Sequence, residues 1–374
     1  MIRLLVDRQS FRYTGFFGAC FDSYVANNRR LTAVLLEKYT IMKIAILAPI
    51  AWRTPPRHYG PWEQMASNLA EGLVAKGMDV TLFATADSLT SGILAAICAK
   101  GYEEDREADA KVNECMHISY LMEQARDFDI IHNHFDFLPL TYSRLIKTPV
   151  VTTIHGFSSH KIIPVYQRYN DIGRYVSISN SDRHASLNYA ATVYNGIRTE
   201  DFAFEPTPEN YLLYYGRIHP DKGTHDAVQI ALHSRRKLII AGIIQDEAYF
   251  NEKVKPYIDD EQIIYIGAVG GEERSMLLGE ASALLHPIYF EEPFGLSVAE
   301  AMLCGTPVIA YNRGSMPELI NDRKTGFLVN NLHEAAACVE DLSLINRQDC
   351  HLHAKNNFSA ETMTEKYIAV YNQL

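Results

Sequence analysis

Cysteine is scarce in this chain, and the few cysteines form no pattern. The 374 residues contain six of them, with no C-x-x-C pair. Their scatter argues against a disulfide framework and against a zinc site built from paired cysteines. We therefore expect reduced thiols and a cytoplasmic location.

Positive charge and long apolar runs are also lacking. The chain has 35 lysines and arginines against 45 aspartates and glutamates, a net charge of -10. This net negative charge argues against nucleic acid and anionic membranes as general partners. It is compatible with a local basic pocket for one phosphate ligand. No apolar run approaches the ~18 residues that cross a bilayer. We predict no transmembrane segment and, from the charges scattered through the N-terminal residues, no signal peptide. Peripheral membrane contact and a homodimer stay open.

The length of the chain predicts two domains, each large enough for its own core. Residues 42–200 are predicted as the first domain, 201–359 as the second, and 360–374 as a closing helix. Met42-Lys-Ile-Ala-Ile-Leu-Ala-Pro49 is typical of the first strand of an α/β domain. Residues 1–41, including a short helix expected at 31–39, therefore form an N-terminal extension of unclear role.

Short apolar strands alternate with helices through both halves, which implies parallel sheets covered by helices on both faces. Residues 88–126 are predicted as helical with a charged loop at 102–109, and the polar residues 198–210 as a linker. The expected strands are Lys43–Ala48, Val80–Ala84, Ile130–Asn133, Val150–Ile154, Tyr175–Ser179 and Ala191–Tyr194 in the first half, and Tyr211–Tyr215, Leu238–Ala241, Ile263–Ile266, Ala283–Pro287 and Pro307–Ala310 in the second.

The stretch 286–318 carries the strongest functional pattern. After a strand end and a loop, Gly295 opens a helix. A helix N-terminus just past a strand end presents free N–H groups and the positive end of the helix dipole, which suits a phosphate. Glu292 and Glu300 bracket this turn, and carboxylates accept hydrogen bonds from sugar hydroxyls. Together these features predict a nucleotide-sugar site, although an ordinary βαβ unit would also explain the two glutamates alone.

Two basic residues are expected at the same sheet edge. Gly216-Arg217 ends the first strand of the second half, and Lys222-Gly223 opens the helix that follows. Ligands of open α/β sheets bind outside the carboxyl ends of the strands. A guanidinium and an ammonium group placed there can hold a diphosphate without a metal. Two solvated basic residues are the alternative.

The first half offers three further motifs. Thr153-Ile154-His155-Gly156 ends a strand, where a histidine is either functional or a hydrogen-bonded structural residue. In Tyr59-Gly60-Pro61-Trp62-Glu63, the glycine allows close approach of a ligand, the proline removes one backbone donor, and the helix dipole alone would explain the glutamate. In His132-Asn133-His134-Phe135-Asp136, the two histidines share a strand face, but nothing completes a metal ligand set. We predict no metal, and for His134 and Asp136 an acceptor-side or lining role.

These motifs together resemble a known family. Glu292-Pro-Phe-Gly-Leu-Ser-Val-Ala-Glu300 has E-x7-E spacing, and GTPVIAYNRGSMPELI and TGFLV follow it. With GR-x4-KG at 216–223, the chain resembles the retaining glycosyltransferases of family 4 from about Met42 onward. The resemblance implies the α/β GT-B fold, in which two Rossmann-like, doubly wound parallel-sheet domains face a central cleft and the last helix crosses back to the first domain.

The resemblance also implies an activity. The expected enzyme is a metal-independent retaining hexosyltransferase that moves glucose or mannose from a nucleotide-diphosphate sugar to a hydroxyl acceptor, which is a glycan, a lipid-linked molecule or a small molecule. UDP-glucose is the first candidate for the sugar donor and a GDP-sugar the next, and no permanently bound cofactor is expected. The implied catalytic residues are His155, Arg217, Lys222 and Glu292; the implied donor-binding residues are Gly60, Phe294, Gly295, Leu296 and Glu300; and the acceptor-side candidates are Glu63, His134 and Asp136.

Other function classes remain as alternatives. A sugar-nucleotide epimerase or a phosphorylase would share the fold, and a phosphorylase would require a lysine that holds pyridoxal phosphate. A non-catalytic sugar-nucleotide-binding module is the alternative outside the enzymes. A dehydrogenase is disfavoured because no G-x-G-x-x-G follows Leu47.

Overall fold

The computed structural model describes residues 41–157 and 159–374, and Lys43–Leu374 form one compact unit. The predicted N-terminal extension and its short helix lie outside the described residues. Within the described part of the chain, no helix is long and apolar enough to cross a membrane.

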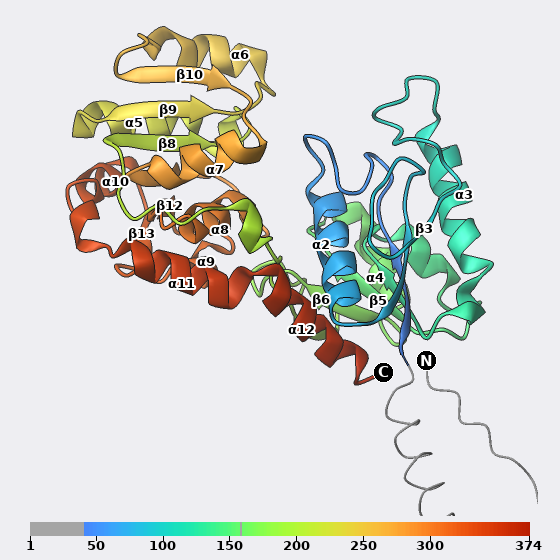
Figure 1. Cartoon of the computed structure of the whole chain (residues 1–374). Coiled ribbons are helices and arrows are strands. Elements are labelled where there is room, and N and C mark those ends of the chain that lie inside the picture. The colour runs from blue at the N-terminus through green and yellow to red at the C-terminus, as the bar shows by residue number, and fades with distance from the viewer. Residues whose placement is uncertain (1–40, 158) are drawn as a thin grey trace, which may run out of the picture. The chain divides into compact units, whose positions relative to one another are not determined.

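The first sheet has seven strands in the order β3-β2-β1-β4-β5-β6-β7, and every neighbouring pair is parallel. Strands β3, β5 and β6 of this sheet are labelled in Figure 1. The strand order reverses direction between β1 and β4, which makes the carboxyl ends of these strands a topological switch point. The strands are β1 Lys43–Leu47, β2 Asp79–Phe83, β3 Ile93–Ala95, β4 Ile130–Asn133, β5 Val150–Ile154, β6 Arg174–Ser177 and β7 Tyr189–Thr192.

Three α-helices accompany this sheet: α2 Pro61–Ala75, α3 Ala110–Met122 and α4 Ile163–Arg168. Helix α2 begins at a proline, which fits a first helical position because no N–H is needed there. Helix α3 buries Ile118 and Leu121 in a core cluster with Leu47 and Phe83 from the sheet. Burial of these apolar side chains against the sheet therefore determines the position of the helix, for which the sequence pattern gave only a broad range.

The prediction of a helical 88–126 is wrong in its first half. Residues Ile93–Ala95 form the edge strand β3, paired with β2, and the helix runs only from Ala110 to Met122. Asp109 caps α3, because its side chain accepts a hydrogen bond from the Val112 N–H. The pairing with β2 decides the structure of an apolar segment whose length alone suits either a strand or a helix.

The second sheet has six parallel strands in the order β10-β9-β8-β11-β12-β13. This order also reverses direction, here between β8 and β11, so that the loops after those two strands lie at one edge. The strands are β8 Tyr211–Tyr215, β9 Lys237–Ala241, β10 Ile263–Gly267, β11 Ala283–His286, β12 Val308–Tyr311 and β13 Gly326–Val329. The last of them was not predicted as a strand.

Helices cover both faces of the second sheet. Helix α5 contacts α10, whereas α8 contacts α7 and α11, so the helices form two separate groups. Their bounds are α5 Thr224–Ser234, α6 Glu247–Tyr249, α7 Gly271–Glu280, α8 Leu296–Leu303, α9 Met316–Leu319, α10 Leu332–Cys338 and α11 Arg347–Phe358. The sheets and helices together are two Rossmann-like domains, as the family resemblance implied.

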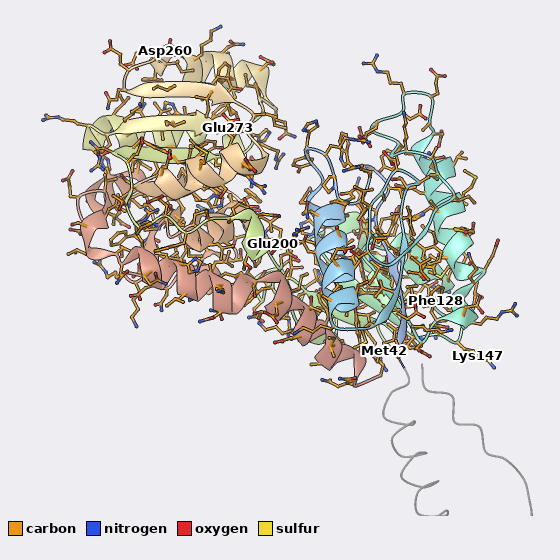
Figure 2. All side chains as sticks on the ribbon, in the orientation of Figure 1. Met42, Phe128, Lys147, Glu200, Asp260 and Glu273 are labelled. Carbon is orange, nitrogen blue, oxygen red and sulfur yellow. The ribbon has the colours of Figure 1, made fainter. Side chains whose placement is uncertain are left out.

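The chain passes from the first sheet to the second through residues 193–210, which hold the short 3-10 turn Thr199–Asp201; Glu200 in this turn is labelled in Figure 2. The last helix, α12 Ala360–Tyr371, packs against α2 of the first domain. Lys76 at the end of α2 lies 3.1 Å from Glu361 and 2.9 Å from Glu365. The end of the chain therefore contacts the first sheet's helices although it follows the second sheet.

Candidate functional site

The predicted basic residues and the predicted glutamate loop lie at the carboxyl edge of the second sheet. Strand β8 leads into Arg217 and the turn Pro220–Lys222, and the neighbouring strand β11 leads into the loop that carries Glu292. Because β8 and β11 are parallel and adjacent, their following loops meet at one edge.

Lys222 and Glu292 form an ion pair at this edge. The Lys222 Nζ lies 2.5 Å from Glu292 Oε2, and the two side chains are only 15% and 14% exposed. The ammonium group also lies 4.6 Å from the centre of the Phe290 ring. On the other side, His286 Nε2 lies 3.8 Å from the same carboxylate oxygen. Burial, with a smaller effect of the Lys222 charge, lowers the pKa of His286 to about 3, so that of these two neighbours of Glu292 the histidine is neutral and only Lys222 is positively charged.

Gly223 fixes the position of Lys222. Its φ of 67° lies in the left-handed region, and a Cβ at this position would lie 1.9 Å from the Pro287 carbonyl oxygen. No other residue type allows this approach of the Lys222 turn to the end of β11.

Arg217 lies at the same edge and is half-buried. Its Nη1 donates a hydrogen bond to the side-chain oxygen of Gln245, in the segment after β9. The second predicted cation is therefore held by a neutral side chain, which leaves its charge uncompensated by this contact.

The Glu292 loop is hydrogen-bonded to the turn before α9. The Ser315 N–H donates to the Glu292 carbonyl oxygen at 3.0 Å, and the Ser315 hydroxyl donates to the Phe294 carbonyl oxygen at 2.6 Å. Gly314 N–H donates to the Glu291 carboxylate at 2.6 Å. Three hydrogen bonds thus fix a loop that has no regular secondary structure of its own.

Helix α8 begins at Leu296, directly after Gly295 with a φ of 90°, as predicted. No side chain caps this helix start. The N–H groups of the predicted segment 294–296 lie before the first intrahelical hydrogen bond, from the Val298 N–H to the Gly295 carbonyl oxygen, and are therefore available to an anion.

Glu300 is buried in the second turn of α8 and has a partner that the sequence did not indicate. Arg274 of α7 places its Nη1 3.4 Å from Glu300 Oε1 and lies 4.8 Å from the centre of the Phe202 ring. Burial raises the pKa of Glu300, and the Arg274 charge opposes that shift. The charges of a buried carboxylate and a guanidinium thus balance each other at Glu300, one of the implied donor-binding residues.

His155 follows β5 of the first sheet and lies between two rings. Trp62 stacks on it with ring centroids 5.7 Å apart, and His134 Nδ1 lies 2.9 Å from His155 Nε2. Burial lowers the pKa of His155 to about 3, which makes this side chain a neutral imidazole.

The acceptor-side candidates differ in exposure and in partners. His134 is 1% exposed and Glu63 is 3% exposed, so neither presents a free surface. The Trp52 N–H donates to Glu63 at 3.2 Å, and burial raises the Glu63 pKa to about 7. Asp136, with a φ of 74°, accepts a hydrogen bond from the Tyr166 hydroxyl.

Gly60 directly precedes α2, with a φ of 152°. A Cβ there would lie 2.9 Å from Pro56 Cβ and 3.0 Å from a Glu63 oxygen. The glycine is required by close packing of the protein itself, so its presence does not by itself indicate a ligand.

A loop of the first domain contacts a loop of the second domain next to His155 and Glu292, two of the implied catalytic residues. A Cβ on Gly156, the neighbour of His155, would lie 3.1 Å from Cγ of Pro293, the neighbour of Glu292. His155 and Glu292 therefore belong to loops that meet.

Glu318 of α9 makes a second contact between these domains, and no role had been predicted for it. Its carboxylate accepts hydrogen bonds from the Asn180 N–H at 2.8 Å, the Ser181 N–H at 2.8 Å and the Tyr194 hydroxyl at 3.0 Å. A carboxylate of the second domain thus satisfies backbone donors of the loop after β6.

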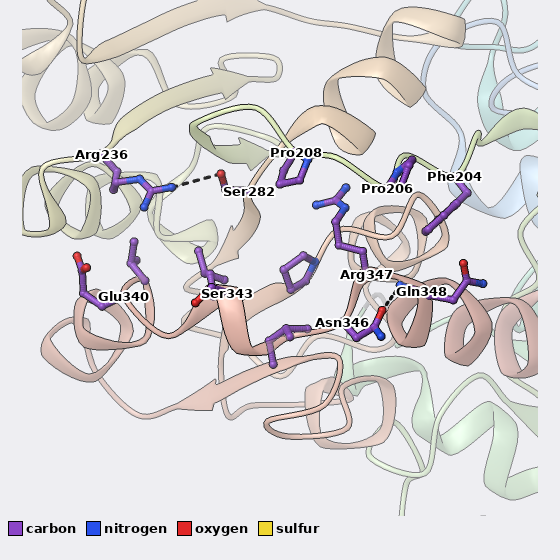
Figure 3. Close-up of a pocket in the computed structure, with 14 residues that line it drawn as sticks. Phe204, Pro206, Pro208, Arg236, Ser282, Glu340, Ser343, Asn346, Arg347 and Gln348 are labelled. Atoms are coloured by element: carbon purple, nitrogen blue, oxygen red, sulfur yellow. Dashed lines mark hydrogen bonds between the residues drawn. The ribbon is translucent and has the colours of Figure 1, made fainter.

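A cavity lined by residues of the second domain lies away from this constellation. It measures about 630 Å³, and Figure 3 shows the residues that line it. Arg236, Ser282 and Pro307 precede β9, β11 and β12, so the cavity lies at the amino ends of the strands. Arg347 in its wall already donates to the carbonyl oxygens of Glu205 and Ala281. We place the site at the opposite, carboxyl edge, where charged groups and a helix N-terminus converge.

No cluster of three or more histidine, cysteine, aspartate or glutamate side chains with the geometry of a metal site occurs among residues 41–157 and 159–374. Of the two neighbouring histidines His132 and His134, His132 is hydrogen-bonded to the hydroxyl groups of Tyr371 and Thr153.

Comparison with known proteins identifies the family. Residues 63–201 match the model of Glycosyltransferase Family 4, and residues 198–358 match that of Glycosyl transferases group 1. An uncharacterized 41.2 kDa protein in the cps region of Klebsiella pneumoniae is 32% identical over an alignment 167 residues long, which covers 43% of this chain and 45% of that protein. The chain thus matches less than half the length of this relative.

Two longer matches cover both domains. Glycogen synthase of Mycobacterium tuberculosis is 23% identical over an alignment 334 residues long, which covers 74% of this chain and 80% of that enzyme. The crystal structure of Anabaena Alr3699/HepE in complex with UDP-glucose superimposes with a TM-score of 0.66 at 18% identity, covering 89% of this chain and all of that one. The two adjacent family models and this shared architecture show that the chain is a glycosyltransferase of family 4 with the GT-B fold.

Proposed function

We propose that this glycosyltransferase is a retaining hexosyltransferase that uses a nucleotide-diphosphate sugar without a metal ion. A UDP-sugar, UDP-glucose first, is the favoured sugar donor and a GDP-sugar the next, because a structural neighbour binds UDP-glucose. The observation that carries the proposal is the Lys222–Glu292 pair at 2.5 Å, at the carboxyl edge of the second sheet.

This ion pair suits a site that must receive an anion and a sugar together. A diphosphate attracts Lys222 away from Glu292, because it offers more negative charge than one carboxylate. The released Glu292 carboxylate then accepts hydrogen bonds from the hydroxyls of the sugar. One binding event thus supplies partners for both groups.

The charge that develops on the leaving diphosphate is stabilised by groups already in place. Lys222 and Arg217 supply two cations, and the start of α8 supplies N–H groups from Phe294 to Leu296. Groups aimed at the position where charge develops need no reorganisation during the reaction, which is the main source of electrostatic catalysis. Transfer occurs on the front face of the sugar, and the leaving phosphate helps to deprotonate the acceptor hydroxyl.

The remaining residues orient the two substrates. Glu300 holds the ribose, for which its contact with Arg274 must open or be shared. His155 contacts the sugar as a neutral imidazole from the first domain. Acceptor binding is assigned to the loops near Glu63 and Asp136.

The test is a transfer assay with UDP-glucose and GDP-mannose, in the presence and absence of EDTA. We expect nucleotide release with one of these sugars, no loss in EDTA, and by NMR a product with the anomeric configuration of the sugar donor. Arg217→Ala and Lys222→Ala should each lower turnover severely. Arg144→Ala, which removes a surface pair with Asp171 at 2.8 Å, is the matched control and should turn over normally. Inverted product or full loss of activity in EDTA would reject the proposed mechanism.

A further inference from the structure

His134 and His155 meet because β4 and β5 are neighbouring parallel strands. The register pairs His132 with Val151 and Asn133 with Thr152, so the residues that follow the two strands lie side by side. His134 Nδ1 lies 2.9 Å from His155 Nε2, and their ring centroids are 5.1 Å apart. His134 is almost fully enclosed, whereas His155 keeps 9% of its surface exposed.

One proton lies between these two nitrogens, and it belongs to one ring or the other. If His134 carries it, Nδ1–H donates to His155 Nε2, and His155 bears its own proton on Nδ1. If His155 carries it, Nε2–H donates to His134 Nδ1, and His134 must bear its proton on Nε2. Burial keeps both rings neutral, because it lowers the pKa of each.

The surroundings of His134 decide between the two arrangements. Its Nε2 is buried and has no hydrogen-bond partner among the residues that the structure describes. A buried N–H without an acceptor is rarer in proteins than an acceptor with an unused lone pair, because the lost hydrogen bond to water is not replaced. The arrangement with an unprotonated Nε2 on His134 is therefore the stable one.

We propose that His134 is a positioning residue that fixes His155 as its Nδ1–H tautomer, so that His155 offers a hydrogen-bond donor to an oxygen of the bound sugar. The proposal rests on the role of His155 in the proposed function. Nδ1 of His155 makes no hydrogen bond within the described part of the chain. His134 itself, at 1% exposure, acts through His155 and not on the acceptor.

The neighbouring rings hold this pair in place. The His132 ring centroid lies 4.3 Å from that of His134. His132 is fixed at both nitrogens, by the Tyr371 hydroxyl at 2.6 Å and the Thr153 hydroxyl at 2.8 Å. Since Tyr371 belongs to α12, the last helix of the chain supports the histidine pair from behind.

The direct test is the tautomer of His155, read from ¹⁵N NMR of histidine-labelled protein at neutral pH. We expect a protonated Nδ1 and an unprotonated Nε2 in the wild type. His134→Asp replaces the hydrogen-bond donor with a carboxylate that can only accept, and should shift His155 toward protonation at Nε2. His134→Asn, whose amide can donate from nearly the same position, should keep the Nδ1–H form. A wild-type His155 protonated at Nε2, or an unchanged tautomer in His134→Asp, would overturn the proposal.

Kinetics then separate positioning from acceptor binding. His134→Asp should lower kcat by about 10- to 100-fold, the usual cost of losing a residue that orients a functional histidine, with the KM for the acceptor unchanged. His134→Asn should regain most of kcat. A rise in acceptor KM without loss of kcat would instead assign His134 to acceptor binding. Full activity of His155→Ala would reject the role of His155 in the proposed function, whereas the tautomer measurement stands independently of activity.

Discussion

Replacement of Lys222 by methionine separates the two roles that the Lys222–Glu292 pair is expected to play. Methionine keeps most of the aliphatic chain that packs beside Phe290, where the ammonium lies 4.6 Å from the ring centre. It removes only the charge that lies 2.5 Å from Glu292. The variant therefore tests electrostatics with little loss of packing.

The structure sets the size of the two expected effects. Loss of one preorganised group that stabilises developing negative charge typically costs about 10²- to 10³-fold in kcat, or about 2.7–4 kcal/mol. For stability, the pair lies between an exposed one, worth about 0–1 kcal/mol, and a buried one whose disruption costs about 3–5 kcal/mol. Because the two side chains are 15% and 14% exposed, we expect Lys222→Met to destabilise the fold by about 1–2 kcal/mol.

A second substitution distinguishes these effects. In Lys222→Met/Glu292→Gln, no unpaired carboxylate remains, so thermal unfolding should return toward that of the wild type. Activity should not return, because the cation is still absent. The assay measures nucleotide release at saturating UDP-glucose beside thermal unfolding in the same buffer. Turnover of Lys222→Met within about threefold of the wild type, with the protein folded, would refute the electrostatic reasoning.

Three further predictions follow from single contacts. Gly223→Ala should lower the melting temperature strongly, because its Cβ would lie 1.9 Å from the Pro287 carbonyl oxygen, whereas Gly270→Ala, with no atom within 4 Å of its Cβ, should not. Glu63→Gln should remove a pH dependence of the wild-type stability, because burial raises the Glu63 pKa from 4.5 to about 7 and the folded state therefore binds the proton more tightly than the unfolded state. As pH rises from 4.5 to about 7, the wild type should lose at most about 3 kcal/mol of stability relative to the variant, with no further divergence above that range. Equal pH profiles of the two proteins in denaturant unfolding would contradict this prediction. Glu318→Ala leaves the Asn180 and Ser181 N–H groups without their carboxylate and should cost about 1 kcal/mol in thermal unfolding, since water can reach these exposed groups; an unchanged melting temperature would show that the contact does not stabilise the fold.

The order of strands and helices was largely predictable because its signals are local. Apolar runs marked most strands, the proline at α2 and the glycine before α8 marked helix starts, and the alternation implied parallel sheets. The segment 88–126 and strand β13 were not predictable in this way. Strand β3 is a three-residue edge strand defined by its pairing with β2, which a linear pattern does not contain.

The sequence motifs indicated candidate residues that the structure brings to one sheet edge, but they did not indicate the contacts of these residues. Sequence motifs indicated Lys222, Glu292 and Glu300, yet the partner of Glu300 is Arg274, in a helix with no motif of its own. Similarly, His134 and His155 are 21 positions apart, and only the neighbouring placement of β4 and β5 brings them within 2.9 Å. Contacts of this kind depend on strand order, which spacing along the chain does not encode.

The central claim is that the departing diphosphate is neutralised by fixed protein groups. A crystal structure of the enzyme with the nucleotide-diphosphate sugar tests it most directly. We predict the two phosphates within hydrogen-bond distance of Lys222, Arg217 and the N–H groups at the start of α8, with Glu292 released toward the sugar. Phosphates bound away from both cations, or bridged to the protein by a divalent ion, would contradict the account.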